Sequence, residues 1–293
     1  MNIFEYSEAI RKMRDFFQGE KGFIEIPSQS RRSILAACED PKTISQYIFS
    51  GVNWPLPQTG QMWLEKELLN HPTVPGVFCI STSYRNEPDP IPGRHDKIFP
   101  MFEFESQGNV DDMINLELEL LDFLGFETNG MNGAPPPSQA KKTHNGPYFI
   151  KYDEACMELN TGTQHLEAEH ETYLQKRLSD IIFLTDFPLR SDPFWNMKQI
   201  EGGSHFNKVD VLLYGMETIG SAERSCNVNE MRDLFYTISD GQYAKLLFNH
   251  FGKLRVEREL ESYFSLNMFQ RFGGGIGLTR ICRALRLLNE SRV

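Results

Sequence analysis

The sequence predicts an α+β fold in which an antiparallel β-sheet is flanked by helices. Strands of alternating polarity are mixed with amphipathic helices, and residues 209–223, "VDVLLYGMETIGSAE", indicate a strand, a turn and a returning strand. The glycine-rich segment lies near the C-terminus, whereas a dinucleotide-binding α/β fold carries its glycine-rich turn after the first strand. Both observations favour α+β over a doubly wound α/β sheet.

The composition is that of an acidic globular protein. The chain has 293 residues, of which 40% are hydrophobic and 24% charged, enough for a sizeable core. A formal net charge of −10 disfavours generic nucleic-acid binding, because phosphate contacts need Lys and Arg. The five scattered cysteines form no CxxC pair, so we expect neither zinc nor disulfides. We find no signal peptide or membrane-spanning run and expect a cytoplasmic protein.

The individual elements follow from the spacing of apolar residues. Helices are expected where apolar positions recur at helical spacing: 5–18, 60–71, 111–124, 153–159, 230–235 and 243–251. Strands are expected where apolar residues alternate or run together: 22–28, 76–87, 101–105, 180–188 and 209–223. Residues 127–147 are rich in Gly, Pro and Asn. We interpret them as a loop insertion in one domain that spans residues 1–293, because the later strands read as parts of the same sheet.

The glycine-rich segment is "RFGGGIGLTR", residues 271–280. It lacks the Lys that follows the glycines of a P-loop. Glycines in a strand allow another backbone or a ligand to approach closely, so structural packing is one interpretation. Ligand binding is the other, since Arg280 falls at the start of the next helix, where a fixed guanidinium can face a phosphate. The segment alone leaves both open.

A second candidate is the stretch "TSYRNEPDPIPGRHDKIFPMFEFES", residues 82–106. Arg85 and Glu87 stand at the end of a strand, Arg94 and His95 lie in the following loop, and Phe99 begins the returning strand. These residue types suit a nucleoside triphosphate. An Arg can contact the α-phosphate, a basic loop the outer phosphates, and an aromatic ring can stack on a purine.

These two stretches and the segment 22–28, which includes Pro27, resemble motifs 3, 2 and 1 of class II aminoacyl-tRNA synthetases. The resemblance follows the right order and spans most of the chain. It implies a class II antiparallel sheet flanked by helices and a homodimer formed through motif 1. It implies Arg85, Glu217 and Arg280 as catalytic residues. It also implies an ATP site formed by Arg85, Glu87, Arg94, His95, Phe99, Glu217, Gly277 and Arg280.

Within this family, the aspartyl, asparaginyl and lysyl subgroup is the most similar. Residues 59–65, "TGQMWLE", are similar to the "SGQLNGE"-type segment of asparaginyl-tRNA synthetases. The resemblance implies that Gln61 contacts the substrate amino group and that Glu65 reads its side chain. Leu64 stands where aspartyl enzymes carry a Lys that reads a carboxylate, and Glu65 would repel such a group. A solvated Glu on a helix face is the alternative interpretation of Glu65.

Residues 215–225, "GMETIGSAERS", are similar to the "GEIIGGSQRE" segment of asparaginyl enzymes. The resemblance implies that Glu217 holds Mg²⁺ and ATP, and that Gly220, Ser221 and Arg224 contact the substrate. Glu217 follows Asp210 by seven positions, a spacing that matches aspartyl and lysyl enzymes.

Some features depart from the subgroup. Ile98 replaces a glutamate of the returning strand, which puts one adenine or amino-acid contact in doubt. The "GGGIG" form of motif 3 is closer to that of ammonia-dependent asparagine synthetases. The first helix and motif 1 begin almost at Met1, so we expect no anticodon-binding domain before them. Together with the negative charge, this disfavours tRNA as a partner.

We therefore expect an AMP-forming ligase that uses ATP and Mg²⁺. It would activate an Asp- or Asn-like amino acid as an adenylate and transfer it to ammonia or a small amine, as asparagine synthetases of this fold do. Two alternatives remain open. One is aminoacyl transfer to tRNA or to a protein, and the other is a non-catalytic paralogue that binds an amino acid or nucleotide. No membrane partner is expected.

Overall fold

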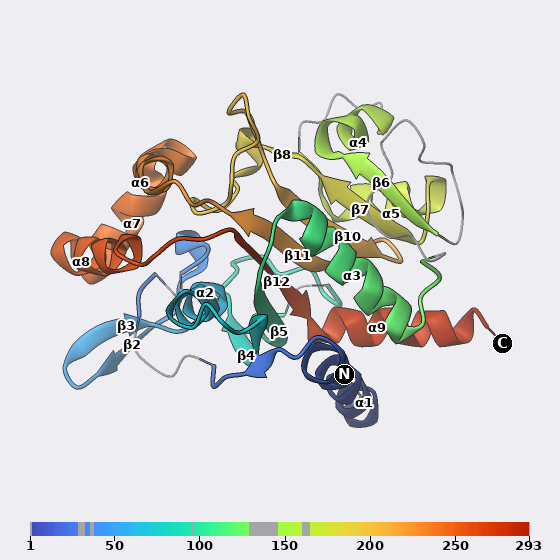
Figure 1. Ribbon diagram of the computed structural model, residues 1–293. Coiled ribbons are helices and arrows are strands. Elements are labelled where there is room, and N and C mark those ends of the chain that lie inside the picture. Colours follow the sequence, from blue (N-terminus) through green and yellow to red (C-terminus); the bar gives the residue numbers. More distant parts are fainter. Residues whose placement is uncertain are drawn as a thin grey trace.

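The computed structural model describes residues 2–28, 33–35, 38–94, 96–128, 146–159 and 165–292. Its main sheet contains Ile24–Glu25 (β1), Gly76–Tyr84 (β4), Ile98–Gln107 (β5), Pro147–Lys151 (β6), Ile181–Thr185 (β7), Lys208–Leu213 (β10), Met216–Arg224 (β11) and Arg271–Gly277 (β12). The strand order is β1-β4-β5-β12-β11-β10-β7-β6 (Figure 1). Neighbours from β4 to β7 are antiparallel, whereas β1 with β4 and β6 with β7 are parallel edge pairs. The predicted α+β class is confirmed, with parallel pairing added at both edges.

One face of the sheet, here called the back face, is covered by α1 (Ile3–Arg14), α3 (Val110–Leu124) and α9 (Leu278–Glu290) (Figure 1). After α1 the chain continues through a wider π-helical segment, Asp15–Glu20. The apolar side of these helices packs on the strands, and the ring of Phe17 lies 4.8 Å from that of Phe102 and 5.1 Å from that of Phe104. The amphipathic spacing that predicts helices at 5–18 and 111–124 thus reflects burial against the back face.

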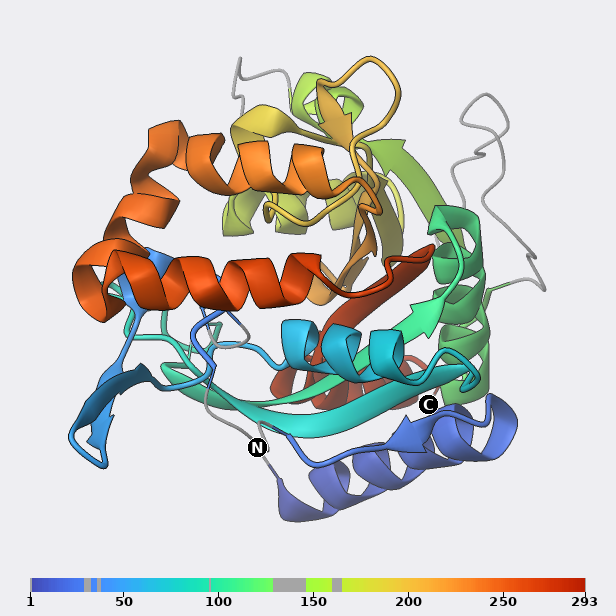
Figure 2. The ribbon, with the colours of Figure 1, turned by 60° about the vertical axis from the view of Figure 1, so that its left-hand side comes forward.

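The opposite face, here called the front face, is covered by α2 (Gln61–Asn70), α6 (Val228–Thr237), α7 (Gln242–Phe251) and α8 (Lys253–Phe264). Helices α4 (Tyr152–Glu158) and α5 (Ala168–Arg177) pack near β6 and β7. Figure 2 shows α2 and α8 in front of the sheet and the hairpin β2 (Gln46–Phe49) and β3 (Val52–Pro55) beside them. A second ribbon pairs β8 (Phe187–Pro188) with β9 (His205–Phe206). Short 3₁₀ turns occur at Pro41–Thr43, Leu189–Ser191 and Ile238–Gly241.

Several sequence predictions need revision. The strand predicted at 22–28 is only two residues long, and α5, α8, β6 and the β2–β3 hairpin were not predicted. Most of the predicted loop insertion at 127–147 lies outside the described residues.

All five cysteines carry free thiols. Among the described helices, none combines the length and apolar character that a membrane crossing requires.

The glycine run is strand β12, which pairs with β5 on one side and β11 on the other. A Cβ atom added to Gly273 would lie 2.1 Å from the carboxylate of Glu105, and one added to Gly274 would lie 2.8 Å from Cβ of Ser221. Larger residues at these two positions would therefore clash with side chains on either face. Structural packing thus explains why glycine occupies positions 273 and 274, because the side chains of Glu105 and Ser221 lie directly against the backbone there.

Glu117 of α3 is a buried acid on the back face. Burial, opposed in part by the neighbouring Ser221 hydroxyl, raises the pKa of Glu117 to about 8. A carboxyl pKa raised above its unfolded value of about 4.3 favours the protonated native state. The stabilisation by this group is therefore complete below about pH 4 and is lost as the pH rises to about 8.

We predict that Glu117→Gln, which mimics the protonated acid, is more stable than the wild type by an amount that grows with pH. The difference should be about 1 kcal/mol near pH 5 and on the order of 3–5 kcal/mol at pH 8.5. Urea denaturation between pH 5 and 9 measures it. Glu119→Gln, on the same helix at a half-exposed position, is the control. A stability difference that does not change with pH would contradict the prediction.

Candidate active site

A cavity of about 220 Å³ lies where β4, β5, β11, β12 and the start of α9 meet. Of the eight residues predicted to bind ATP, the seven that the structure describes all line it: Arg85, Glu87, Arg94, Phe99, Glu217, Gly277 and Arg280. The eighth, His95, lies outside the described residues. Residues that are 195 positions apart in the sequence, such as Arg85 and Arg280, therefore share one cavity.

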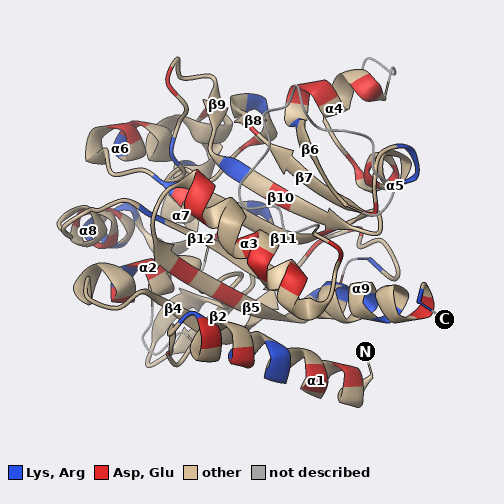
Figure 3. Cartoon of the chain, turned by 45° about the vertical axis from the view of Figure 1, so that its right-hand side comes forward, with Lys and Arg blue, Asp and Glu red and all other residues tan. Residues whose placement is uncertain are grey.

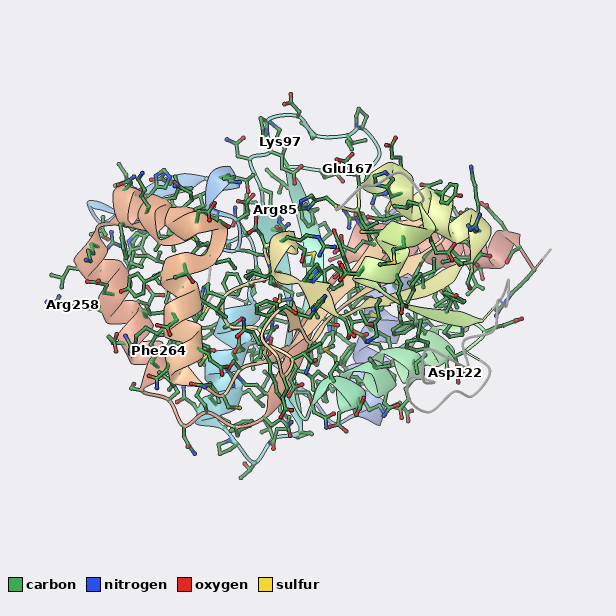
Figure 4. All side chains as sticks on the ribbon, turned by 90° about the horizontal axis from the view of Figure 1, so that it is seen from above. Arg85, Lys97, Asp122, Glu167, Arg258 and Phe264 are labelled. Carbon is green, nitrogen blue, oxygen red and sulfur yellow. The ribbon has the colours of Figure 1, made fainter. Side chains whose placement is uncertain are left out.

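Arg85 follows β4 directly and is held by its backbone, whose N–H donates to the carbonyl of Lys97 at 2.8 Å. Its guanidinium forms an ion pair with Glu39 and lies 5.9 Å from the ring centre of Phe99. The Nε atom is buried and has no hydrogen-bond partner among the described residues. Seen from above, Arg85 lies between helix α8, on which Arg258 and Phe264 are labelled, and the segment at Glu167 (Figure 4). A buried, unpaired N–H group is suited to an anionic ligand.

Arg94 belongs to the loop between β4 and β5 and is tied to the opposite side of the cavity. It forms an ion pair with Glu171 of α5, and both side chains are largely buried. Glu171 also accepts a hydrogen bond from the backbone N–H of Glu217 at 2.8 Å. Burial, followed by the charge of Glu217, raises the pKa of Glu171. Helix α5 thus connects the basic loop to the strand that carries Glu217, a link that the sequence did not reveal.

Arg280 stands in the first turn of α9, as predicted, directly after β12. Its Nη1 donates to the carbonyl of Glu217 at 2.7 Å and lies 3.6 Å from the Glu217 carboxylate. The side chain is about one quarter exposed. The guanidinium is therefore fixed to β11 while its remaining N–H groups can face a ligand in the cavity.

Two carboxylates converge on the front face over Gly220. A Cβ atom added to Gly220 would lie 3.2 Å from Oε1 of Glu217 and 3.5 Å from Oδ1 of Asp210. Oδ1 of Asp210 is buried without a hydrogen-bond partner among the described residues, while Oδ2 accepts from Lys208 at 2.8 Å. Burial, opposed by Lys208, raises the pKa of Asp210 to about 7.

This pair fits the donor set that Mg²⁺ uses when it is bound by one or two carboxylates and the phosphates of a substrate. The described residues contain no cluster of three or more His, Cys, Asp or Glu side chains that could hold a metal without such phosphates. The resemblance implied this role for Glu217 alone, and Asp210 entered only through its spacing from Glu217. The seven-residue spacing was the signal that could have identified Asp210 as well.

The residues predicted to bind the substrate meet beside this cavity. Nη2 of Arg224 donates to Oε1 of Gln61 at 3.4 Å and to the Glu105 carboxylate at 2.5 Å. Figure 3 shows acidic residues in the middle of β5, the strand that carries Glu105, although β5 is an interior strand of the sheet. Nε2 of Gln61 lies 3.2 Å from the position that a Cβ atom on Gly275 would take, and Gly275 lines the cavity that holds Glu217 and Arg280. Gln61 thus lies against the wall of that cavity, and Gly220 pairs with Gly275 in the neighbouring strand.

Glu65 is fully buried, so the alternative of a solvated helix-face Glu is wrong. Its carboxylate accepts hydrogen bonds from Asn196 at 2.6 Å and from Tyr263 at 2.8 Å. It also accepts from Nη2 of Arg271 at 2.9 Å and lies 3.7 Å from Nε of Arg224. Direct contact between Glu65 and a substrate would require one of these partners to give way.

Ser221 does not lie with the other predicted substrate residues. Neighbouring residues of a strand point to opposite faces, so Gly220 and Arg224 face the front while Ser221 faces the back. Its buried hydroxyl donates to the carbonyl of Val209 at 3.2 Å and lies beside Glu117. Its position therefore does not support a contact between the Ser221 side chain and a substrate.

Comparison with protein families gives one match that covers most of the chain. The family described as class II tRNA synthetases (D, K and N) matches residues 2–291. A search among curated proteins found no match.

Solved structures with the same fold include three that illustrate the range. Asparaginyl-tRNA synthetase from Pyrococcus horikoshii, complexed with asparaginyl-adenylate, has a TM-score of 0.75 and 18% identity, covering 98% of this chain and 65% of that one. The asparaginyl-adenylate complex of the Entamoeba histolytica asparaginyl enzyme has a TM-score of 0.70 and 17% identity, with coverages of 96% and 62%. The E. histolytica aspartyl enzyme has a TM-score of 0.69 and 18% identity, with coverages of 97% and 55%. This chain therefore spans less than two thirds of these proteins and shares the fold of their matching part.

Proposed function

This chain belongs to the family of class II (D, K and N) tRNA synthetases, and on that premise we propose that it is an ATP-dependent, AMP-forming ligase. It activates the carboxylate of an Asp- or Asn-like amino acid as an adenylate, releases pyrophosphate, and transfers the acyl group to ammonia or a small amine. The observation that carries the proposal is the cavity that gathers Arg85, Glu217, Gly277 and Arg280 from separate elements.

In this function the protein supplies position and charge more than acid–base chemistry. The substrate carboxylate attacks the α-phosphate, and negative charge develops on the phosphate oxygens. Arg85 stabilises that charge with its unpaired Nε–H, and Arg280 holds the nucleotide from the opposite wall. Phe99 stacks on the base. Glu217 and Asp210 would hold Mg²⁺, which neutralises phosphate charge when it is bound.

Amino-acid-dependent exchange between ATP and pyrophosphate, measured for all twenty amino acids with and without ammonium, tests the proposal. We expect exchange with an acidic amino acid or its amide, and formation of an amide and AMP when ammonium is added. Failure of every amino acid to support exchange would contradict adenylate formation. It would favour a non-catalytic binding paralogue.

A second candidate is aminoacyl transfer to tRNA, which the family and the similar structures favour. The net charge of −10 argues against it, because tRNA binding relies on basic surface. If one amino acid supports exchange at a rate that ammonium does not change, and tRNA from the same cell is acylated with it, the acceptor is tRNA and not a small amine.

A further inference from the structure

Glu171 of α5 is not among the residues that line the cavity of Arg280, yet its carboxylate contacts two residues that do, Arg94 and Glu217. It forms an ion pair with the guanidinium of Arg94 and accepts a hydrogen bond from the backbone N–H of Glu217 at 2.8 Å. The side chains of Arg94 and Glu171 are 11% and 13% exposed. Because solvent screens such a pair less than a surface pair, Glu171 constrains the position of the Arg94 guanidinium.

Helix α5 presents Glu171 from a fixed place. A Cβ atom added to Gly215, in the turn between β10 and β11, would lie 3.1 Å from Cα of Thr172, the residue after Glu171. Leu174 of the same helix is fully buried in the core that α5 forms with β7 and β10. Arg94, by contrast, belongs to the loop between β4 and β5. A side chain on a packed helix is positioned more precisely than one on a loop, so Glu171 is the anchor of the pair.

The charges around Arg94 explain why it needs such an anchor. The charged residues that line the cavity are Arg85, Glu87, Arg94, Asp96, Glu217 and Arg280. An unanchored guanidinium at position 94 can pair with one of these acids and is then lost to an anionic ligand. Arg283 of α9 is also near, since burial and the charges of Arg286 and Arg94 lower the pKa of Arg283. Glu171 offsets this repulsion between cations from outside the cavity, where it takes no space from a ligand.

Glu171 has acidic neighbours of its own. The carboxylates of Glu217 and Asp210 are near enough to repel it, although Lys208 neutralises Asp210 in part. The charge of Arg94 offsets this repulsion. The ion pair therefore stabilises both partners in places where each alone would be repelled.

Such an ion pair can act on a ligand in two opposite ways. It can withhold Arg94, so that a phosphate has to break the pair before it binds, or it can orient Arg94 toward the phosphate. A guanidinium has five N–H donors, and Arg94 lines the cavity while it is paired with Glu171. Donors therefore remain for a ligand without loss of the pair, which favours orientation.

We propose that Glu171 is a positioning residue that acts through Arg94 and holds its guanidinium toward the phosphates of ATP. This inference rests on the proposed function, since it assigns a further residue to the same site. Glu171 then affects the binding of the nucleotide and not that of the amino acid. Its loss should raise the KM for ATP and leave the KM for the amino acid nearly unchanged.

The first test is ATP–pyrophosphate exchange with Glu171→Gln and Glu171→Ala. Both contacts of Glu171 use Oε2, so the Gln variant can keep this acceptor while it removes the charge. We expect its KM for ATP to rise about 5- to 10-fold, and that of Glu171→Ala, which loses both hydrogen bonds, about 10- to 100-fold. Glu169→Gln is the control, because Glu169 stands in the same turn of α5 but is 81% exposed. Its KM for ATP should stay within about two-fold of the wild type.

A double-mutant cycle with Arg94→Met separates positioning from a general structural role. If Glu171 acts through Arg94, then Glu171→Gln should have no further effect on the KM for ATP, within about two-fold, once Arg94 is Met. Damage to α5 itself would add its own loss in that background. Losses that add in the double variant would therefore overturn the inference.

Two further results would also overturn it. An unchanged KM for ATP in Glu171→Gln would mean that Arg94 needs no anchor, and a lowered KM would mean that Glu171 withholds Arg94 from the nucleotide. If no amino acid supports exchange, the proposed function has failed, and calorimetric titration with Mg²⁺ and a non-hydrolysable ATP analogue decides on Glu171. Binding that Glu171→Gln weakens only when Arg94 is present would support the inference, whereas equal binding, or none to the wild type, would overturn it.

Discussion

Arg280→Ala is expected to reduce amino-acid-dependent ATP–pyrophosphate exchange by about 100- to 1,000-fold. The guanidinium is held at 2.7 Å on the carbonyl of Glu217, which places it before ATP arrives. A preorganised donor stabilises developing phosphate charge without reorganisation, so its removal raises the barrier directly. Arg280→Lys should recover only part of the activity, because an ammonium cannot form the two parallel hydrogen bonds of a guanidinium.

A matched control comes from the same helix. Arg286 of α9 is exposed and lies outside the cavity that Arg280 lines, in a groove between α1 and α9. Arg286→Ala should retain exchange within about two-fold of the wild type, as is usual for an exposed position. Both variants should keep the wild-type far-ultraviolet circular dichroism spectrum. Near-normal exchange in Arg280→Ala would remove this residue from the proposed catalytic set.

The elements that bring Arg85, Phe99 and Arg280 to one cavity could be predicted because their signals are local. A strand followed directly by Arg85, a basic loop and a returning strand with Phe99 form a hairpin, and these signals lie within one short stretch. The helix that carries Arg280 in its first turn follows its glycine strand without a gap. Such segments can be predicted one by one from local patterns. The resemblance to a family then predicts that the hairpin and the glycine strand with its helix form one site.

The parts that could not be predicted depend on distant residues. Glu65 is buried because Tyr263 and Arg271, 198 and 206 positions away, satisfy its carboxylate. No local pattern contains that information. The orientation of Ser221 is different, because strand alternation alone excludes a shared face with Gly220. The similarity to the asparaginyl segment placed Gly220 and Ser221 in one site. Strand alternation, which turns Ser221 to the other face, was not taken into account.

The pairing of Glu65 with Arg271 leads to the largest expected effect on stability. Both side chains are fully buried, and Arg271 donates to Oε2 of Glu65 through Nε at 3.0 Å and Nη2 at 2.9 Å. Glu65→Ala leaves the guanidinium in the interior without its counter-charge. We expect a loss of about 3–5 kcal/mol in the free energy of unfolding, measured by urea denaturation.

Replacing both partners separates the charge effect from the loss of packing. The double variant Glu65→Leu with Arg271→Met removes both charges, so it should be more stable than Glu65→Ala by at least about 1 kcal/mol. Glu65→Gln keeps one hydrogen-bond acceptor but turns an NH2 group toward a donor that the carboxylate accepts from, so its stability should fall between theirs. A loss below about 1 kcal/mol in Glu65→Ala would mean that the carboxylate does not need Arg271. Glu65 would then be available to contact the substrate directly, as its resemblance to the asparaginyl segment implied, and exchange kinetics of the same variant would show a raised KM for the amino acid.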